Sequence, residues 1–216
     1  MNERKSVAIE ITLIFSFIMV LVWTLPGDPK NWTLGHWILV TLGLVFVLGS
    51  WRYRKDNLKM VGLLPDDFNQ ARPIFIWVMA SLSVLIGMAF IINPVFWEQP
   101  NFGQKVSDQL KNYLAWAVFQ QLILHGYFTN RLQIIFKKPW LTAMIAGLLF
   151  ALVHLPNPVL AIGALIFGGA GAYFFLKSRN LYILALAHAI LGTAVKYLVA
   201  NQLLDHAMRV GPGFWK

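Results

Sequence analysis

The chain has 216 residues, of which 58% are hydrophobic and only 12% are charged, with a mean hydropathy of +0.62. Soluble domains carry about 25% charged residues, so this composition excludes an ordinary soluble domain and predicts an all-α, polytopic membrane protein. The absence of cysteine excludes disulfides, thiolate catalysis and cysteine-ligated metals. A net charge of +9 suggests nucleic acid in a soluble protein, but here we attribute it to membrane topology and anionic lipid head groups, and we expect no nucleic-acid partner.

Apolar segments follow one another along the whole chain. At about 20 residues per span, this length supplies roughly seven transmembrane helices joined by short loops. We expect one membrane-embedded domain over residues 1–216, a helical bundle with additional short surface helices. The predicted spans are Val7–Leu25, Leu34–Trp51, Pro73–Asn93, Tyr113–Arg131, Trp140–His154, Val159–Leu176 and Leu181–Val199.

The distribution of Lys and Arg predicts the topology. Most of them fall in loops that share one side of the membrane, and cytoplasmic loops carry an excess of these residues. Arg131 is one of the cations that we interpret in this way. The N-terminus is therefore predicted to lie in the cytoplasm and the C-terminus outside.

Two features of the spans have structural interpretations. The segment Gly163–Ala172 is rich in small residues at three- and four-residue spacing, which favours close approach of a neighbouring helix. Every aspartate lies outside the predicted spans, so an intramembrane aspartyl protease has no catalytic pair. Glu10 is the one glutamate within a span, and we expect it to cap the helix or to reach toward the interface rather than react. The sequence patterns of zinc proteases and of serine hydrolases are also absent.

Polar side chains on three separate spans form the candidate site. They are Gln120, Gln121 and His125 on the fourth span, His154 on the fifth and His188 on the seventh. Polar groups inside a membrane usually face a bundle interior or a wet cavity, and they mark functional sites. Residues four apart on an α-helix lie about 5–6 Å apart on one face, so we expect Gln121 and His125 to be neighbours. The alternative is that each histidine only bonds a backbone carbonyl or another helix.

These residues resemble the CPBP family, the membrane-embedded CAAX prenyl proteases and bacteriocin-processing enzymes, also called the Abi family. The family's first motif has two glutamates, three further residues and then Arg-Gly; Gln120–Gly126 keeps this frame and the glycine but replaces both glutamates and the arginine. The second motif, Phe-x-x-x-His, is matched by Phe150 and His154. The third, histidine followed four residues later by asparagine, is half matched by His188 and Gly192. The resemblance indicates a protease-like core over about residues 113–200.

The resemblance implies catalysis in which a glutamate activates water while histidines and asparagine position it and stabilise the oxyanion. A glutamine amide has no basic form, so neither Gln120 nor Gln121 can take a proton from water. General-base catalysis is worth about 10²–10⁴-fold, so another base is required for activity. Histidine has an unperturbed pKa of about 6.5 and can fill that role. We assign Phe150, Gly192 and Thr193, which lie in or beside the motifs, to substrate binding.

Three hypotheses remain open at this point. In the first, the protein is a divergent intramembrane endopeptidase without a cofactor, in which His125 or His154 is the base, His188 orients or stabilises, and the glutamines bind the substrate carbonyl. In the second, it is an inactive relative that binds a membrane peptide as a chaperone, immunity protein or assembly partner. In the third, His125, His154 and His188 hold a divalent metal such as zinc, with the glutamines supporting them.

The surroundings of the site follow from the predicted topology. At 1.5 Å per residue, Gln120 is expected about 10 Å below the outer surface. His154 is expected near the outer end of its span, and His188 near mid-depth. We therefore expect a site that opens outward or laterally, in an integral protein of a bacterial inner (plasma) membrane. Its expected partners are membrane lipids and a membrane-associated peptide or protein substrate.

Overall fold

The structure is a computed structural model that describes residues 3–25, 33–64, 71–205 and 208–215. Within these ranges every regular element is helical and no strand occurs, which confirms the all-α prediction. The first half of the chain forms α1 (Glu3–Thr24), α2 (Leu34–Arg54), the short α3 (Leu58–Val61), α4 (Ala71–Ile92) and the 3-10 turn η3 (Phe96–Glu98).

The second half begins with one continuous helix in three parts, which are α5 (Phe102–Gln121), the π-helical segment η4 (Leu122–Thr129) and α6 (Asn130–Phe136). It is followed by α7 (Pro139–Leu152) and α8 (Pro158–Ser178). The chain then forms α9 (Leu181–Ala194), a second π-helical segment η5 (Val195–Ala200), α10 (Asn201–Leu203) and the 3-10 turn η6 (Gly211–Trp215).

Five helices of the described chain are long and apolar enough to cross a membrane. They are α1, α2, α4, α8 and the continuous helix Leu181–Leu203. These helices confirm a polytopic membrane protein, although seven spans were expected. Of the other two expected spans, α7 is apolar but has only 14 residues, and the helix that contains Tyr113 begins at Phe102, inside the predicted loop. Its first turns are polar, with Gln104 Nε2 donating to Asp108 at 2.9 Å, so they resemble a loop in composition.

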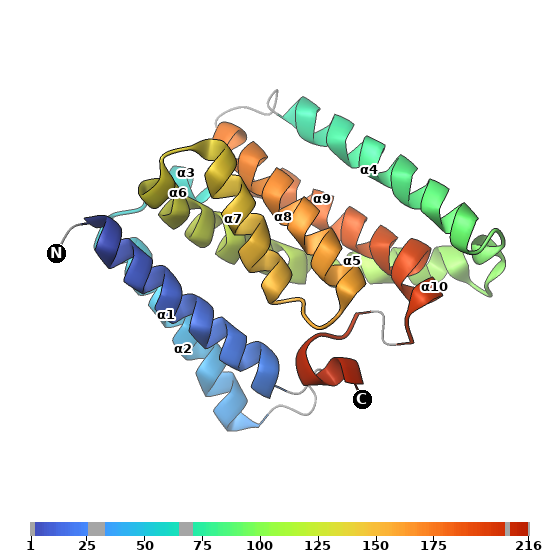
Figure 1. Cartoon of the computed structure of the whole chain (residues 1–216), viewed down its shortest axis with the longest axis horizontal. Coiled ribbons are helices and arrows are strands. Elements are labelled where there is room, and N and C mark those ends of the chain that lie inside the picture. The colour runs from blue at the N-terminus through green and yellow to red at the C-terminus, as the bar shows by residue number, and fades with distance from the viewer. Residues whose placement is uncertain (1–2, 26–32, 65–70, 206–207, 216) are drawn as a thin grey trace.

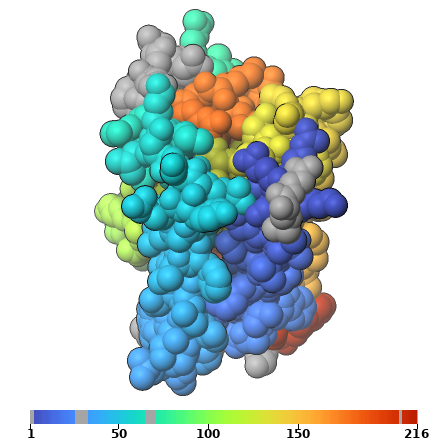
Figure 2. Space-filling view, turned by 90° about the vertical axis from the view of Figure 1, so that its left-hand side faces the viewer, coloured from blue at the N-terminus to red at the C-terminus, as the bar shows by residue number. Residues whose placement is uncertain are grey.

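The helices are arranged around a central group. In Figure 1, α4 lies along α9 at one edge of the molecule, and the α1–α2 pair lies at the other edge. The view in Figure 2 shows α1 and α2 side by side on one face. Between these edges lie α5 to α9, which contain all the polar residues of the candidate site.

The closest packing of the bundle joins α7 to α8. A Cβ added at Gly147 of α7 would lie 2.6 Å from the carbonyl oxygen of Leu165 and 2.8 Å from the backbone nitrogen of Gly169 on α8. Backbone atoms cannot move aside as a flexible side chain can. The small residues of α8 therefore allow close approach, as their spacing predicted.

Gly147→Ala is expected to lower the free energy of unfolding by about 1–3 kcal/mol, because the added methyl overpacks the interface. Gly163→Ala, in the small-residue segment of α8, is the matched control, because its Cβ would meet nothing within 4 Å. Alanine is favoured over glycine in a helix by about 1 kcal/mol, so the control should melt at the wild-type temperature or above it. Thermal unfolding in detergent checks both variants, and equal melting temperatures would contradict the close-approach argument.

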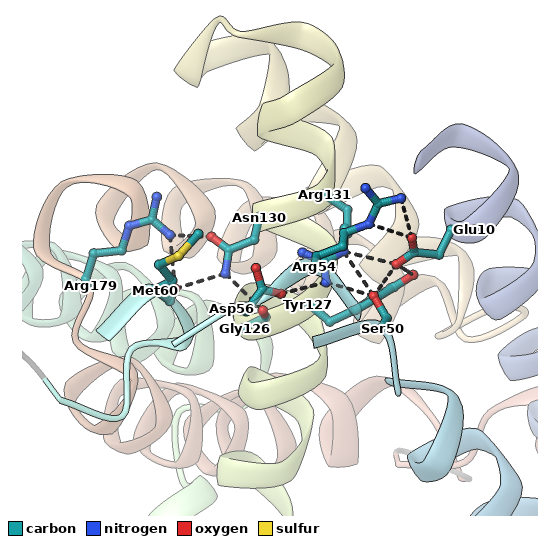
Figure 3. A network of polar contacts seen from close by, with 10 residues as sticks. All are labelled: Glu10, Ser50, Arg54, Asp56, Met60, Gly126, Tyr127, Asn130, Arg131 and Arg179. Carbon is teal, nitrogen blue, oxygen red and sulfur yellow. Dashed lines mark hydrogen bonds and ion pairs between the residues drawn. The ribbon is translucent and has the colours of Figure 1, made fainter. Parts of the chain in front are cut away.

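An ionic network ties α1 and α2 to α6 at the end of the bundle where α1 begins (Figure 3). The Glu10 carboxylate pairs with Arg54 at 2.7 Å and with Arg131 at 3.0 Å. It also accepts hydrogen bonds from Ser50 and from Tyr127. Glu10 therefore pairs with two arginines within the protein and does not cap its helix, and its position relative to the interface stays a prediction.

Arg131 is the centre of this network. Its side chain is only 1% exposed, and its Nη2 donates to Asp56 Oδ2 at 2.6 Å and to Ser50 at 2.7 Å. Asp56 is equally enclosed, with 3% of its side chain exposed. Arg131 is thus a buried partner of two carboxylates, not only the loop cation that the charge distribution suggested. Which side of the membrane this end faces stays a prediction.

Candidate functional site

A chain of hydrogen bonds joins α5 to α9 and brings together three of the predicted polar residues. The amide nitrogen Nε2 of Gln121 lies 2.8 Å from Nδ1 of His188. On the other side of the ring, Nε2 of His188 lies 3.0 Å from the hydroxyl of Tyr113. The same hydroxyl donates to Oε1 of Gln120 at 3.2 Å. We call these four residues the amide–imidazole chain.

The donors and acceptors of the amide–imidazole chain form one consistent set. An amide nitrogen only donates, so Nδ1 of His188 is the acceptor and its proton resides on Nε2. That N–H donates to the oxygen of Tyr113, whose own proton goes to Gln120. Every member is neutral, and both ring nitrogens of His188 are occupied. His188 is therefore held in place and has no free lone pair with which to attack a water proton.

Aromatic rings enclose His188. Phe167 of α8 lies 4.7 Å and Phe150 of α7 lies 5.6 Å from it between ring centroids. At Gly192, where the resembled family has asparagine, a Cβ would lie 2.7 Å from Cε1 of Tyr113. The tyrosine ring thus occupies the space that a side chain at residue 192 would need, and its hydroxyl bonds the histidine one turn away.

Tyr113 was not among the predicted site residues. Its position at the start of a predicted span suggested only a boundary, where interfacial aromatic residues are common. The signal that could have identified it is its spacing of seven residues from Gln120, which places both residues on one face of α5.

His154 lies in the connection between α7 and α8, at the end of α7, as expected. Its Nδ1 lies 2.7 Å from the backbone carbonyl oxygen of Phe150. A carbonyl only accepts, so Nδ1 carries the proton and the lone pair is on Nε2. Burial lowers the pKa of His154 from its ordinary value, and the bond to Phe150 partly offsets this effect. The imidazole is therefore neutral at pH 7, with a basic nitrogen that no residue of the described chain engages.

The ring of Phe150 packs against both His154 and His188. Its centroid is 4.7 Å from that of His154 and 5.6 Å from that of His188. The C-terminal segment holds the connection that carries His154, since the Gly211 backbone nitrogen donates to the Leu155 oxygen at 2.9 Å. His154 therefore lies beside the amide–imidazole chain, on a connection that is held in place by a hydrogen bond from the C-terminal segment.

His125 lies within the π-helical segment η4, four residues after Gln121, and its placement on one face with Gln121 stays a prediction. Its Nδ1 lies 3.2 Å from the hydroxyl of Thr129, which itself donates to a backbone carbonyl. Its ring stacks on Phe175 of α8 with centroids 5.4 Å apart. His125 thus packs against α8, and no hydrogen bond joins it to the amide–imidazole chain.

The second ring nitrogen of His125, Nε2, is enclosed by the protein. Nε2 is buried and has no hydrogen-bond partner in the described chain. A Cβ at Gly171 would lie 2.8 Å from it, so α8 passes directly over this atom. Water has no room between them, and His125 is a poorer candidate base than His154.

Two further polar atoms of the predicted site are buried without a hydrogen-bond partner among the described residues. They are Oε1 of Gln121 and Oγ1 of Thr193. Within the same part of the chain, no three His, Asp or Glu side chains come close enough together to hold a metal ion. The three-imidazole arrangement of the third hypothesis therefore receives no support from the geometry.

The comparisons with known proteins agree with the sequence resemblance. The family model of type II CAAX prenyl endopeptidase Rce1-like proteins matches residues 104–194. This range contains the whole amide–imidazole chain, His125 and His154. No curated protein and no solved structure matches the chain.

Proposed function

We propose that this membrane protein cleaves a membrane-associated peptide or protein with His154 as the general base. The match of residues 104–194 to the model of Rce1-like type II CAAX prenyl endopeptidases supports the proposal. The observation that carries the proposal is the hydrogen bond from His154 Nδ1 to the Phe150 oxygen. It fixes the neutral tautomer in which Nε2 can accept a proton, and the side chain is half-buried rather than sealed.

The proposed reaction needs only groups of this chain and water. Nε2 of His154 takes a proton as the water oxygen attacks the scissile carbonyl, and the resulting imidazolium then gives that proton to the leaving amine. The half-buried Gln120 has an amide nitrogen with no partner in the described chain, and it can donate to the oxyanion. His188 and Tyr113 hold Gln120 in place.

His154→Ala is expected to lower kcat/KM by about 10²–10⁴-fold, the usual contribution of a general base. The assay follows cleavage of a prenylated CAAX-type peptide, the substrate class named by the family, with purified protein in detergent. His36→Ala, which changes a histidine at the start of α2, is the control and should retain the wild-type rate. Because the pKa of His154 is lowered and the base acts unprotonated, the wild-type rate should hold as the pH falls from 7 to about 6.5, the ordinary histidine pKa. A His154→Ala variant at the wild-type rate would refute the proposal.

A second candidate function is binding without cleavage. The amide–imidazole chain favours it, because all four side chains are neutral and neither glutamine can act as a base. In that case the wild-type protein would retain the prenylated peptide without cleaving it, and His154→Ala would bind it equally well.

We further propose that the end of the bundle where α1 begins faces the cytoplasm. His154, at the far end of α7, then lies toward the outer surface of a bacterial inner membrane. The positions of the cations support this orientation through the positive-inside rule. Substrate would enter from outside or laterally from the lipid.

A further inference from the structure

A cavity of about 190 Å³ lies at the end of the bundle where α1 begins, away from the amide–imidazole chain. It is bordered by α6, by the chain after α2 and by the end of α8 (Figure 3). Its polar lining comes from Asp56, Asn130, Arg131, Gln133 and Arg179, and Met60 and Ile134 add an apolar part. The cavity thus combines two guanidinium groups with a carbon-lined wall.

The hydrogen bonds at the rim leave donors free. Nη1 of Arg179 donates to the Met60 carbonyl at 3.1 Å and to Oδ1 of Asn130, but its Nε and Nη2 have no partner in the described chain. Gln133 accepts at Oε1 from Thr142 at 2.8 Å, and its amide nitrogen likewise has none. Three donor groups that border the cavity are therefore without a partner among the described residues. They are Nε and Nη2 of Arg179 and the amide nitrogen of Gln133.

The charge in the cavity is positive. Its one carboxylate, Asp56, is paired with Arg131 at 2.6 Å, which leaves Arg179 without a carboxylate partner among the described residues. Burial lowers the pKa of Arg179 from its ordinary value, as expected for a cation that lacks a full counter-charge. Free donors and a surplus cation together describe a site for an anion.

We propose that this cavity binds a phosphate group, with Arg179 and Gln133 donating to its oxygens. Arginine matches phosphate through paired N–H groups, and phosphate offers enough oxygens for donors from two directions. At about 30 Å³ per water, the cavity holds the volume of about six water molecules, which suffices for a phosphate and part of an ester. Met60 and Ile134 suit the carbon of such an ester. The position at a polar end of the bundle favours an anionic phospholipid, although a soluble phosphate presents the same chemistry.

The test measures the melting temperature of the full chain in detergent at constant ionic strength, as either dioleoylphosphatidylglycerol or sodium phosphate is added. A ligand of the folded state raises the melting temperature in a saturable manner. Saturation with the lipid alone identifies a head-group site, and saturation with both probes identifies a site for the phosphate itself. No saturable rise with either probe overturns the proposal.

Three variants locate the site. Gln133→Glu is nearly isosteric, keeps an oxygen for Thr142 and replaces the free donor with a negative charge, so it should abolish the rise. Arg179→Gln should weaken binding about tenfold or more, the loss expected for a charge-assisted hydrogen bond. Arg209→Gln removes an exposed cation outside the cavity and should bind like the wild type. If Gln133→Glu and the wild type bind equally, the cavity is not the site, and this result does not depend on the folding of the Arg179 variant.

Discussion

Arg131→Met is expected to lower the free energy of unfolding by about 3–5 kcal/mol, the usual cost of removing one partner from a buried ion pair. The reason is Asp56, whose side chain is 3% exposed and is paired with Arg131 at 2.6 Å. Without the guanidinium, the negative charge of Asp56 stays buried without a positively charged partner. Thermal or denaturant unfolding in detergent measures the effect.

Two further variants show whether the loss comes from the buried charge. Asp56→Asn in the Arg131→Met background should recover part of the stability, because an amide costs less to bury than a carboxylate. Asp108→Asn breaks the exposed Asp108–Lys111 pair, whose side chains are 51% and 72% exposed, and should cost no more than about 1 kcal/mol. A loss in Arg131→Met no larger than that of Asp108→Asn would show that the network does not stabilise the fold.

If the protein binds its peptide without cleaving it, the second candidate function, Gln120→Glu is expected to supply the missing base and to raise the rate of peptide cleavage by up to the 10²–10⁴-fold that general-base catalysis typically supplies. On the proposed function the same change removes the oxyanion donor and should lower the rate, so the direction of the change distinguishes the two functions. One oxygen of the new carboxylate would accept from Tyr113, as the amide oxygen does at 3.2 Å. The other would stand where the unpaired amide nitrogen is now, on a half-buried side chain that water can reach. A carboxylate titrates about two pH units below an imidazole, so the variant should also stay active at lower pH. Rates measured across pH 4–8 test both expectations.

Gln121→Glu is the matched control for this gain. Gln121 is fully buried and its amide points to Nδ1 of His188, so a carboxylate there would pair with the imidazole and remain out of reach of water. No increase in rate is expected from it. An equal increase in both variants would mean that the difference in burial between the two glutamines does not govern the chemistry.

The membrane helices could be predicted well because hydrocarbon imposes one simple demand, a long apolar segment. The predicted span Leu34–Trp51 and the observed α2, Leu34–Arg54, begin at the same residue. The start of α5 could not be found in this way, because Gln104 and its polar neighbours make the first turns resemble a loop. A hydropathy pattern detects burial in lipid and does not detect a polar helix.

The site was predictable only as far as motif spacing along the chain indicates it. Sequence spacing joined Gln121 to His188 through the family pattern, and the structure places them in contact. It could not show that His125 stacks on Phe175 of α8, because spacing along the chain does not encode a contact between two helices. It also missed Tyr113. The ring of Tyr113 on α5 fills the space beside Gly192 on α9, and this contact between two helices is a property of the packed structure.

The π-helical segment η4 has one further consequence. A single helix from Phe102 to Phe136 supplies Gln120 and Gln121 to one polar cluster and Arg131 to another. The angle between these clusters around the helix axis is set by the number of residues in η4 and not by their identities. Loss or gain of one residue there would rotate one cluster relative to the other, so we expect this segment to tolerate substitution far better than any change of length.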